Sequence, residues 1–201
     1  MISRRQLGLG LAAASISTPA LALVGTPKQT TGPFYPEALP SESDADLVRI
    51  GNGAAAQGEE IEIVGRVLGS DGRPIREAFV ELWQANTHGR YAHSRDTSPA
   101  PLDPNFQGFG TVLTDEQGRY RFRTIKPGVY PGRTRHLHFR IGGPGFEPLP
   151  TQMYFAGDPG NSRDFLWNSI RNPEARESVT VAFARSAIYP TIETGRFDIV
   201  L

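Results

Sequence analysis

The chain has 201 residues, which suffices for one well-buried core and is short for two domains. Lys plus Arg and Asp plus Glu both total 21, so there is no basic surplus to hold a phosphate backbone, and we expect no nucleic-acid partner. The absence of cysteine excludes disulfides, thiolate metal sites and cysteine nucleophiles, so any metal must be held by His, Tyr or carboxylate.

The first 22 residues have the pattern of a targeting segment. A Ser3-Arg4-Arg5-Gln6-Leu7 stretch precedes an Ala- and Leu-rich run and the small-residue site Ala20-Leu21-Ala22, which resembles a twin-arginine export signal. We therefore predict a signal peptide over 1–22 and a periplasmic or secreted protein, with an amphiphilic anchor or disordered tail as the alternative. Polar residues and a proline interrupt the apolar run, which is too short for a stable membrane span.

Residues 23–58 contain scattered Pro, Gly, Ser and Asp and no sustained period of two or of 3.6 residues. This pattern predicts an extended N-terminal arm. Its one dense cluster, residues 29–36, contains a Phe-Tyr pair between prolines. The remainder, 59–201, is predicted to form one β-sandwich domain.

From residue 59 onward, strand patterns alternate with turn residues. Residues 61–68 and 78–83 around a turn at 70–74, and residues 111–114 and 120–124 around a turn at 115–118, are predicted hairpins. Further strands are predicted at 136–141, 151–155, 178–184 and 196–201. Only 161–171 has helical character, with Asn161 or Ser162 as N-cap and Pro173 just past its end. The predicted fold is all-β, an antiparallel β-sandwich with long loops and one short helix.

Two histidines two residues apart are the most informative feature. If 136–141 is a strand, its period of two places His136, His138 and Arg140 on one face. A His-x-His motif alone is equally typical of an amphipathic strand. The motif gains weight because the chain has four histidines and this pair follows a Pro- and Gly-rich loop that contains Tyr130. The other two histidines flank Tyr91 in a long loop predicted over 86–109, and long ordered loops often carry function.

Imidazole suits iron, zinc or copper, and added phenolates favour a strongly Lewis-acidic ion, because an unperturbed tyrosine has a pKa of about 10. Ferric iron can hold a phenol deprotonated at neutral pH. A zinc or copper site on the same histidines is the alternative, and the tyrosines argue against it.

With these residues, the sequence resembles the intradiol ring-cleavage dioxygenases of the protocatechuate 3,4-dioxygenase type. The order and spacing of the matching segments are more specific than any one alone. These segments are Gln29 to Pro36, Gly65-Arg66-Val67, Val80-Glu81-Leu82-Trp83-Gln84-Ala85-Asn86, Gly89-Arg90-Tyr91, Lys126-Pro127-Gly128-Val129-Tyr130-Pro131, His136-Leu137-His138-Phe139 and Gln152-Met153-Tyr154-Phe155.

The resemblance implies a non-haem Fe(III) enzyme that cleaves a catechol with dioxygen to a cis,cis-muconate-type diacid. It places the metal ligands on Tyr91, Tyr130, His136 and His138, with Tyr130 also the base that accepts a substrate proton. The partners implied are a small catechol, such as protocatechuate, and dioxygen, with a homo-oligomer possible. Only five residues, 131–135, separate Tyr130 from His136, fewer than in the best-known members.

Three further pocket residues follow from the same resemblance. The arginine that stabilises the carbanion-like form of the substrate aligns with Arg133, with Arg135 as the alternative. Gln152 aligns with a glutamine that hydrogen-bonds the substrate or the arginine. Tyr35 either lines the pocket mouth or packs the arm against the sandwich.

Other residues have structural interpretations. His88 and His93 are predicted to be solvated loop residues. The large aromatic side chains that alternate with polar residues are predicted to belong to the core rather than to the site; they are Trp83, Phe122, Phe139 and Phe155. A second class of function stays open, because segment 65–86 also resembles β-sandwich binding modules of the transthyretin or carboxypeptidase-regulatory type, which need no such ligand set.

Overall fold

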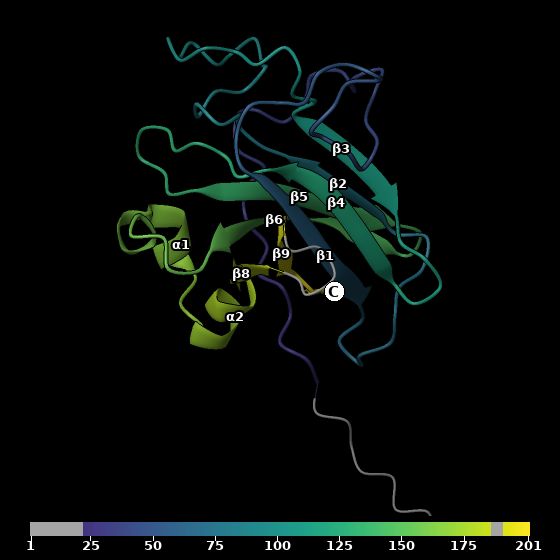
Figure 1. The fold of residues 1–201 in the computed structure, drawn as a ribbon. Coiled ribbons are helices and arrows are strands. Elements are labelled where there is room, and N and C mark those ends of the chain that lie inside the picture. Colours follow the sequence, from purple (N-terminus) through teal and green to yellow (C-terminus); the bar gives the residue numbers. More distant parts are fainter. Residues whose placement is uncertain (1–21, 186–190) are drawn as a thin grey trace, which may run out of the picture.

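The computed structural model describes residues 22–185 and 191–201, and the predicted signal peptide lies outside the described residues except for Ala22. Two five-stranded sheets form the molecule (Figure 1). One has the order β10-β1-β9-β8 with β4 also paired to β1, and the other has the order β3-β2-β5-β6-β7. The strands are β1 (Glu60–Leu68), β2 (Phe79–Trp83), β3 (Phe109–Leu113), β4 (Arg119–Ile125), β5 (His136–Gly143), β6 (Phe146–Phe155), β7 (Thr180–Val181), β8 (Phe183–Arg185), β9 (Glu193–Arg196) and β10 (Ile199–Val200).

The core lies between the two sheets because each contributes the apolar side of an alternating strand. Phe139 of β5 has its ring centroid 6.4 Å from that of Phe122 in β4 and 5.1 Å from that of Phe197. All three side chains are fully buried. Burying one such side chain contributes about 1.5–3 kcal/mol to stability. The predicted all-β sandwich is therefore confirmed.

The sheets are mixed rather than purely antiparallel. Strand β1 pairs in parallel with β9 and β10, and β6 pairs in parallel with β7. Both predicted hairpins are wrong, because β1 and β4 belong to one sheet while β2 and β3 belong to the other. The chain can bury the apolar face of its next strand either by pairing that strand with the preceding one or by crossing to the facing sheet. The period of two therefore does not identify the pairing partner.

The helix predicted over 161–171 is divided into a 3₁₀ turn (Asn161–Arg163) and α1 (Phe165–Ser169), and a further helix, α2 (Pro173–Ser178), follows it. The N-cap of α1 is Asp164, not Asn161 or Ser162. Pro173 begins α2 rather than following a helix end, since proline is well tolerated in the first turn. None of the described helices has the length and hydrophobicity of a bilayer-spanning segment.

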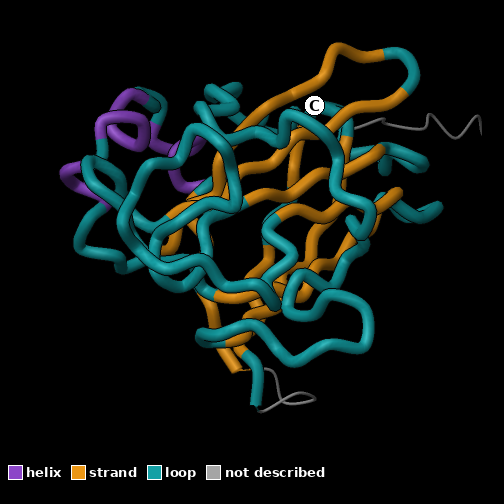
Figure 2. The backbone as a smooth tube through the Cα atoms, turned by 90° about the horizontal axis from the view of Figure 1, so that it is seen from above, coloured by secondary structure: helices purple, strands orange, loops and turns teal. Residues whose placement is uncertain are grey.

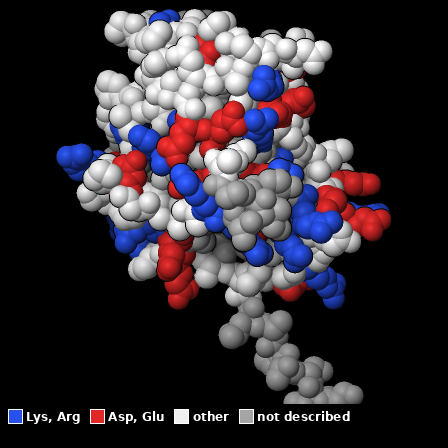
Figure 3. Space-filling view, in the orientation of Figure 1, with Lys and Arg blue, Asp and Glu red and all other residues white. Residues whose placement is uncertain are grey.

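Residues 22–59, all of which the structure describes, form no helix or extended strand. They contact both sheets. The Gln29 backbone N–H donates to Pro150 O of β6 (2.8 Å), and the Thr26 N–H donates to Val200 O of β10 (2.9 Å). Seen from above, loops cover the ends of the strands (Figure 2). Acidic and basic side chains are interspersed on the face shown in Figure 3.

Candidate metal centre

Strand β5 presents two imidazoles side by side on the face turned away from the core. The Nε2 atoms of His136 and His138 lie 3.2 Å apart. The Nδ1 of His136 lies 2.7 Å from the carbonyl oxygen of Thr134, so Nδ1 carries the proton and Nε2 keeps its lone pair. Burial lowers the pKa of His136 to about 3 and that of His138 well below its ordinary value. Both rings are therefore neutral, the form in which histidine binds metals.

Two phenols complete the cluster. The hydroxyl of Tyr130 lies 3.0 Å from His136 Nε2, and the rings of Tyr91 and Tyr130 are 5.8 Å apart. The buried Tyr91 hydroxyl has no hydrogen-bond partner among the described residues. Burial raises the pKa of both tyrosines, that of Tyr91 most strongly. A buried phenol without a partner is costly, and a bound cation would compensate by favouring the phenolate.

The structure thus brings the four predicted ligand positions together. No group of three or more His, Cys, Asp or Glu side chains gathers to hold a metal in the described ranges. A metal at this place would therefore depend on the tyrosines. The donor set of two neutral imidazoles and two phenols fits a hard, trivalent cation such as Fe(III).

Two glycines hold the tyrosine-bearing loops against each other. A Cβ on Gly128 would lie 2.3 Å from Gly89 N, and one on Gly89 would lie 2.2 Å from Val129 O. Gly89 also has a φ of +76°. Each glycine precedes a tyrosine by two residues, Gly89 before Tyr91 and Gly128 before Tyr130. The backbones touch here because neither residue carries a side chain.

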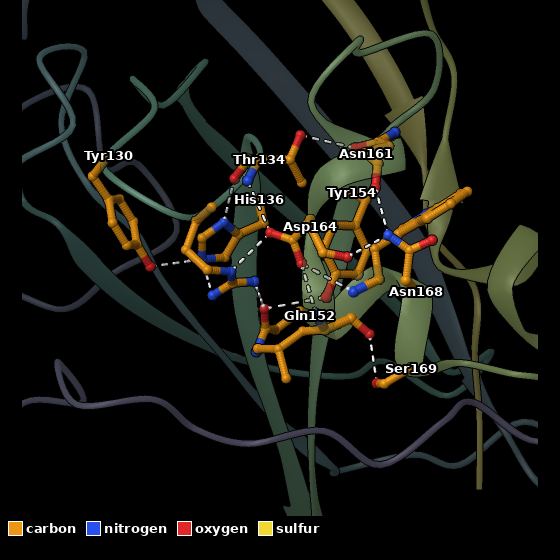
Figure 4. A network of polar contacts seen from close by, with 12 residues as sticks. Tyr130, Thr134, His136, Gln152, Tyr154, Asn161, Asp164, Asn168 and Ser169 are labelled. Carbon is orange, nitrogen blue, oxygen red and sulfur yellow. Dashed lines mark hydrogen bonds and ion pairs between the residues drawn. The ribbon is translucent and has the colours of Figure 1, made fainter.

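Arg133 lies beside His136. Figure 4 shows the network of polar contacts that includes His136, Gln152 and Asp164. The Nη1 of Arg133 is 3.2 Å from His136 Nε2, its Nη2 donates to Gln152 Oε1 (2.6 Å), and its Nε donates to Asp164 Oδ2 (2.8 Å). Arg135 instead pairs with Asp158 (3.7 Å) and lines a separate cavity. Of the two candidate arginines, the structure therefore brings only Arg133 to the site.

Gln152 is fully buried and both ends of its amide are used. Besides accepting from Arg133, it donates through Nε2 to the carbonyl oxygen of Thr30 (3.0 Å). The Tyr154 hydroxyl donates to Gln29 Oε1 (2.7 Å) and lies 3.3 Å from Gln152 Oε1. Gln152 thus joins the arginine to the N-terminal arm.

The arm also touches the site directly. Gly32 has a φ of +69°, and a Cβ there would lie 3.2 Å from His138 Cε1. Tyr35 donates to Glu81 Oε2 (3.1 Å) and its ring meets Trp83 edge-on at 5.0 Å. Its contacts are those of a residue that packs the arm on the sheet, one of the two predicted alternatives.

Trp83 is a buried residue, as predicted, that also contacts the site. Its ring stacks on His138 with centroids 4.9 Å apart and an interplanar angle of 11°. It belongs to a small aromatic cluster with Tyr91 and Phe109, separate from the main core. Phe122, Phe139 and Phe155 do lie in the main core. His88 is exposed, while His93 is half-buried with Nε2 3.1 Å from Tyr35 O.

Asp164 and Trp83 are the site residues that sequence reasoning missed. A signal for Trp83 was present, since on a strand over 79–83 it shares its face with Glu81 and not with Val80 and Leu82. Asp164 directly precedes the apolar Phe165-Leu166-Trp167 stretch, which is typical of an N-cap. Nothing in the sequence linked it to Arg133.

The sequence matches a known protein family. A family model described as Dioxygenase matches residues 30–201. The chain belongs to the intradiol ring-cleavage dioxygenases. It is 46% identical over 158 residues to the protocatechuate 3,4-dioxygenase beta chain of Burkholderia cepacia, covering 72% of this chain and 65% of that protein. It is 31% identical over 189 residues to catechol 1,2-dioxygenase 2 of Acinetobacter lwoffii, covering 81% and 66%.

The chain therefore spans just under two thirds of each of these curated relatives. A solved structure resembles it over more of its length. The dioxygenase domain of a dioxygenase and carbohydrate-binding protein fusion from Streptomyces sp. SirexAA-E has a TM-score of 0.69 at 30% identity, covering 89% of this chain and 98% of that one. An intradiol ring-cleavage dioxygenase from Tetranychus urticae, 20% identical with a TM-score of 0.71, shares the fold.

Proposed function

We propose that this intradiol family member binds Fe(III) through Tyr91, Tyr130, His136 and His138, and cleaves a catechol with dioxygen to a cis,cis-muconate-type diacid. The observation that carries the proposal is the meeting of two neutral imidazoles and two phenols in one buried place. When bound, the iron would supply Lewis acidity and a template for the catechol oxygens.

Tyr130 is proposed as the base that takes a proton from a catechol hydroxyl at its Oη. Support comes from its exposure, since Tyr130 is half-buried whereas Tyr91 is buried. The more accessible phenol is the one an incoming substrate can reach. Tyr91, enclosed by Phe34 at 4.6 Å between ring centroids, is proposed to stay a permanent ligand.

Arg133 is proposed to stabilise negative charge that develops on the substrate ring and its oxygens. Its side chain is only 10% exposed, so its charge acts where water screens it weakly. Gln152 is proposed to hold the arginine rather than to bind substrate, because both ends of its amide are already used. The fully stacked pair of Trp83 and His138 restricts the imidazole to one orientation.

The proposal is tested by the visible absorption spectrum of the iron-replete protein, with and without catechol or protocatechuate. We expect a tyrosinate-to-iron(III) band that shifts with the catechol the enzyme prefers. Tyr91→Phe should weaken the band. The control is Tyr120→Phe, because Tyr120 is equally buried, at 4% exposure, but bonds Phe197 O in the core. An iron-bound but colourless protein would overturn the ligand assignment and favour a binding module.

The names of the two curated relatives suggest which substrates to assay, protocatechuate and catechol. Catechol and protocatechuate differ by one carboxylate, and oxygen consumption with each measures which ring is cleaved. A protein that shows the band, yet consumes no oxygen with either, would retain the metal site and lose the proposed substrate class.

Export is a separate proposal that rests on residues 1–22 alone. Localisation of the full chain, compared with an Arg4→Lys, Arg5→Lys double variant, tests it. Retention of the double variant in the cytoplasm and export of the unmodified chain are expected. Equal distribution of both would contradict twin-arginine export.

A further inference from the structure

Asp164 is buried more completely than its place on a short surface helix requires. It is 1% exposed, although α1 has no buried residue of its own. An N-cap carboxylate needs only to reach the first backbone N–H groups of its helix and can remain in water. Its burial therefore points to a partner outside α1.

The two oxygens of this carboxylate have different partners. Oδ1 accepts from the backbone N–H groups of Leu166 (2.9 Å) and Trp167 (3.0 Å), which caps α1. Oδ2 accepts from Arg133 Nε (2.8 Å) and from the backbone N–H of Thr134 (2.8 Å). Asp164 thus fastens α1 to the loop that connects Tyr130 with His136 (Figure 4).

The guanidinium of Arg133 is held along two of its edges. Asp164 takes the Nε–H, and Gln152 Oε1 accepts from Nη2. Nη1 remains and faces His136 Nε2 at 3.2 Å. With a metal on that nitrogen, its lone pair is no longer an acceptor, so the Nη1 donors are left for a substrate beside the metal.

We infer that Asp164 is a positioning residue, which orients Arg133 so that its Nη1 edge faces the substrate. This inference rests on the proposed function. A long arginine side chain has many rotamers. The buried ion pair with Asp164, whose Oδ2 also accepts from the backbone N–H of Thr134, selects one of them. Asp164 itself does not touch the metal ligands in any described contact; it acts through Arg133.

Two substitutions separate capping from positioning. Asp164→Asn and Asp164→Ser keep a good N-cap for α1 but remove the carboxylate that holds Arg133. We expect kcat to fall about ten- to hundredfold, below the loss from deleting an oriented donor entirely. The dissociation constant for catechol, measured anaerobically by the optical shift, should change less than threefold. Asn172→Ala is the matched control, because Asn172 caps α2 through Glu174 N (2.9 Å) away from the site.

A double-mutant cycle with Arg133→Met decides whether the effect passes through the arginine. Asp164→Asn should lower kcat in the unmodified protein and not in the Arg133→Met background. It should lower the unfolding temperature more in the unmodified protein than in that background, where only the hydrogen bond from Thr134 N–H is lost. An unchanged kcat in both Asp164 variants, or an equal loss in both backgrounds, would overturn the inference. The double-mutant cycle on the unfolding temperature can be measured without turnover. If the unmodified protein is inactive, that result counts against the proposed function, and the cycle still tests whether Asp164 holds Arg133.

Discussion

The contact between the two tyrosine-bearing loops makes Gly128→Ala a sharp perturbation of the proposed metal centre. The added Cβ would lie 2.3 Å from Gly89 N and 2.4 Å from Thr87 O, whereas an ordinary contact begins at 3.4 Å. The loops must therefore separate by about 1 Å. Overpacking of this kind costs about 1–3 kcal/mol. Because Gly128 has no positive φ, the cost is steric, and a Gly-to-Ala change at an open site would instead stabilise by about 0.4–1 kcal/mol.

The displacement reaches Tyr91 and Tyr130, each two residues from the contact. We expect Gly128→Ala to lower the free energy of unfolding, to shift or weaken the tyrosinate band and to lower turnover by about 100-fold, the effect of a 1 Å misplacement. Urea unfolding, the visible spectrum and oxygen consumption measure these three effects. Gly25→Ala is the control, since nothing lies within 4 Å of that position. If Gly128→Ala retains the unmodified stability and spectrum, the loop contact does not position the tyrosines.

Three further predictions concern the base, the core and one surface charge. Tyr130→Phe should slow turnover by about 100-fold or more while lowering iron content less, and parallel losses of both would argue against a base role. Phe139→Ala removes a fully buried ring and should lower the free energy of unfolding by about 3–5 kcal/mol in urea titrations. The backbone N–H and guanidinium of Arg119 hold the pKa of Asp115 below its ordinary value. The carboxylate therefore stabilises the fold above the unfolded-state pKa of about 3.9, and this contribution is lost as pH falls through the lower folded value. The Asp115→Asn variant should have a lower melting temperature than the unmodified protein at neutral pH, and this difference should vanish in acid.

The pairing of the two histidines was predictable because it depends on short-range geometry. His136 and His138 share a face by the period of two, and strand β5 begins at His136. Tyr91 and Tyr130 were assigned as ligands only through the resemblance to the intradiol family. The roles of these four residues in binding iron remain predictions, and the spectrum described above tests them.

The burial of the histidine face was not visible in the sequence. An alternating strand predicts one apolar face and one solvated face, yet His136 and His138 are 3% and 1% exposed. Gly32 of the arm and the ring of Trp83 cover His138, and Tyr130 and Arg133 lie against His136. The arm has no period that predicts where it lies, because its backbone bonds to the sheet only at scattered residues such as Gln29.

The carboxylate partner of each arginine decides which of the two lies at the site. Arg133 and Arg135 precede strand β5, so the period of two does not assign them a face. A buried guanidinium needs a carboxylate, and two aspartates are available in the following segment. Arg133 Nε lies 2.8 Å from Asp164 Oδ2, and Arg135 Nε lies 3.7 Å from Asp158 Oδ2. The pairing follows from burial, since the carboxylate of Asp164 is 0% exposed and that of Asp158 is 15% exposed. The deeper carboxylate holds the arginine that faces His136, and this depth exists only once α1 has folded against the loop.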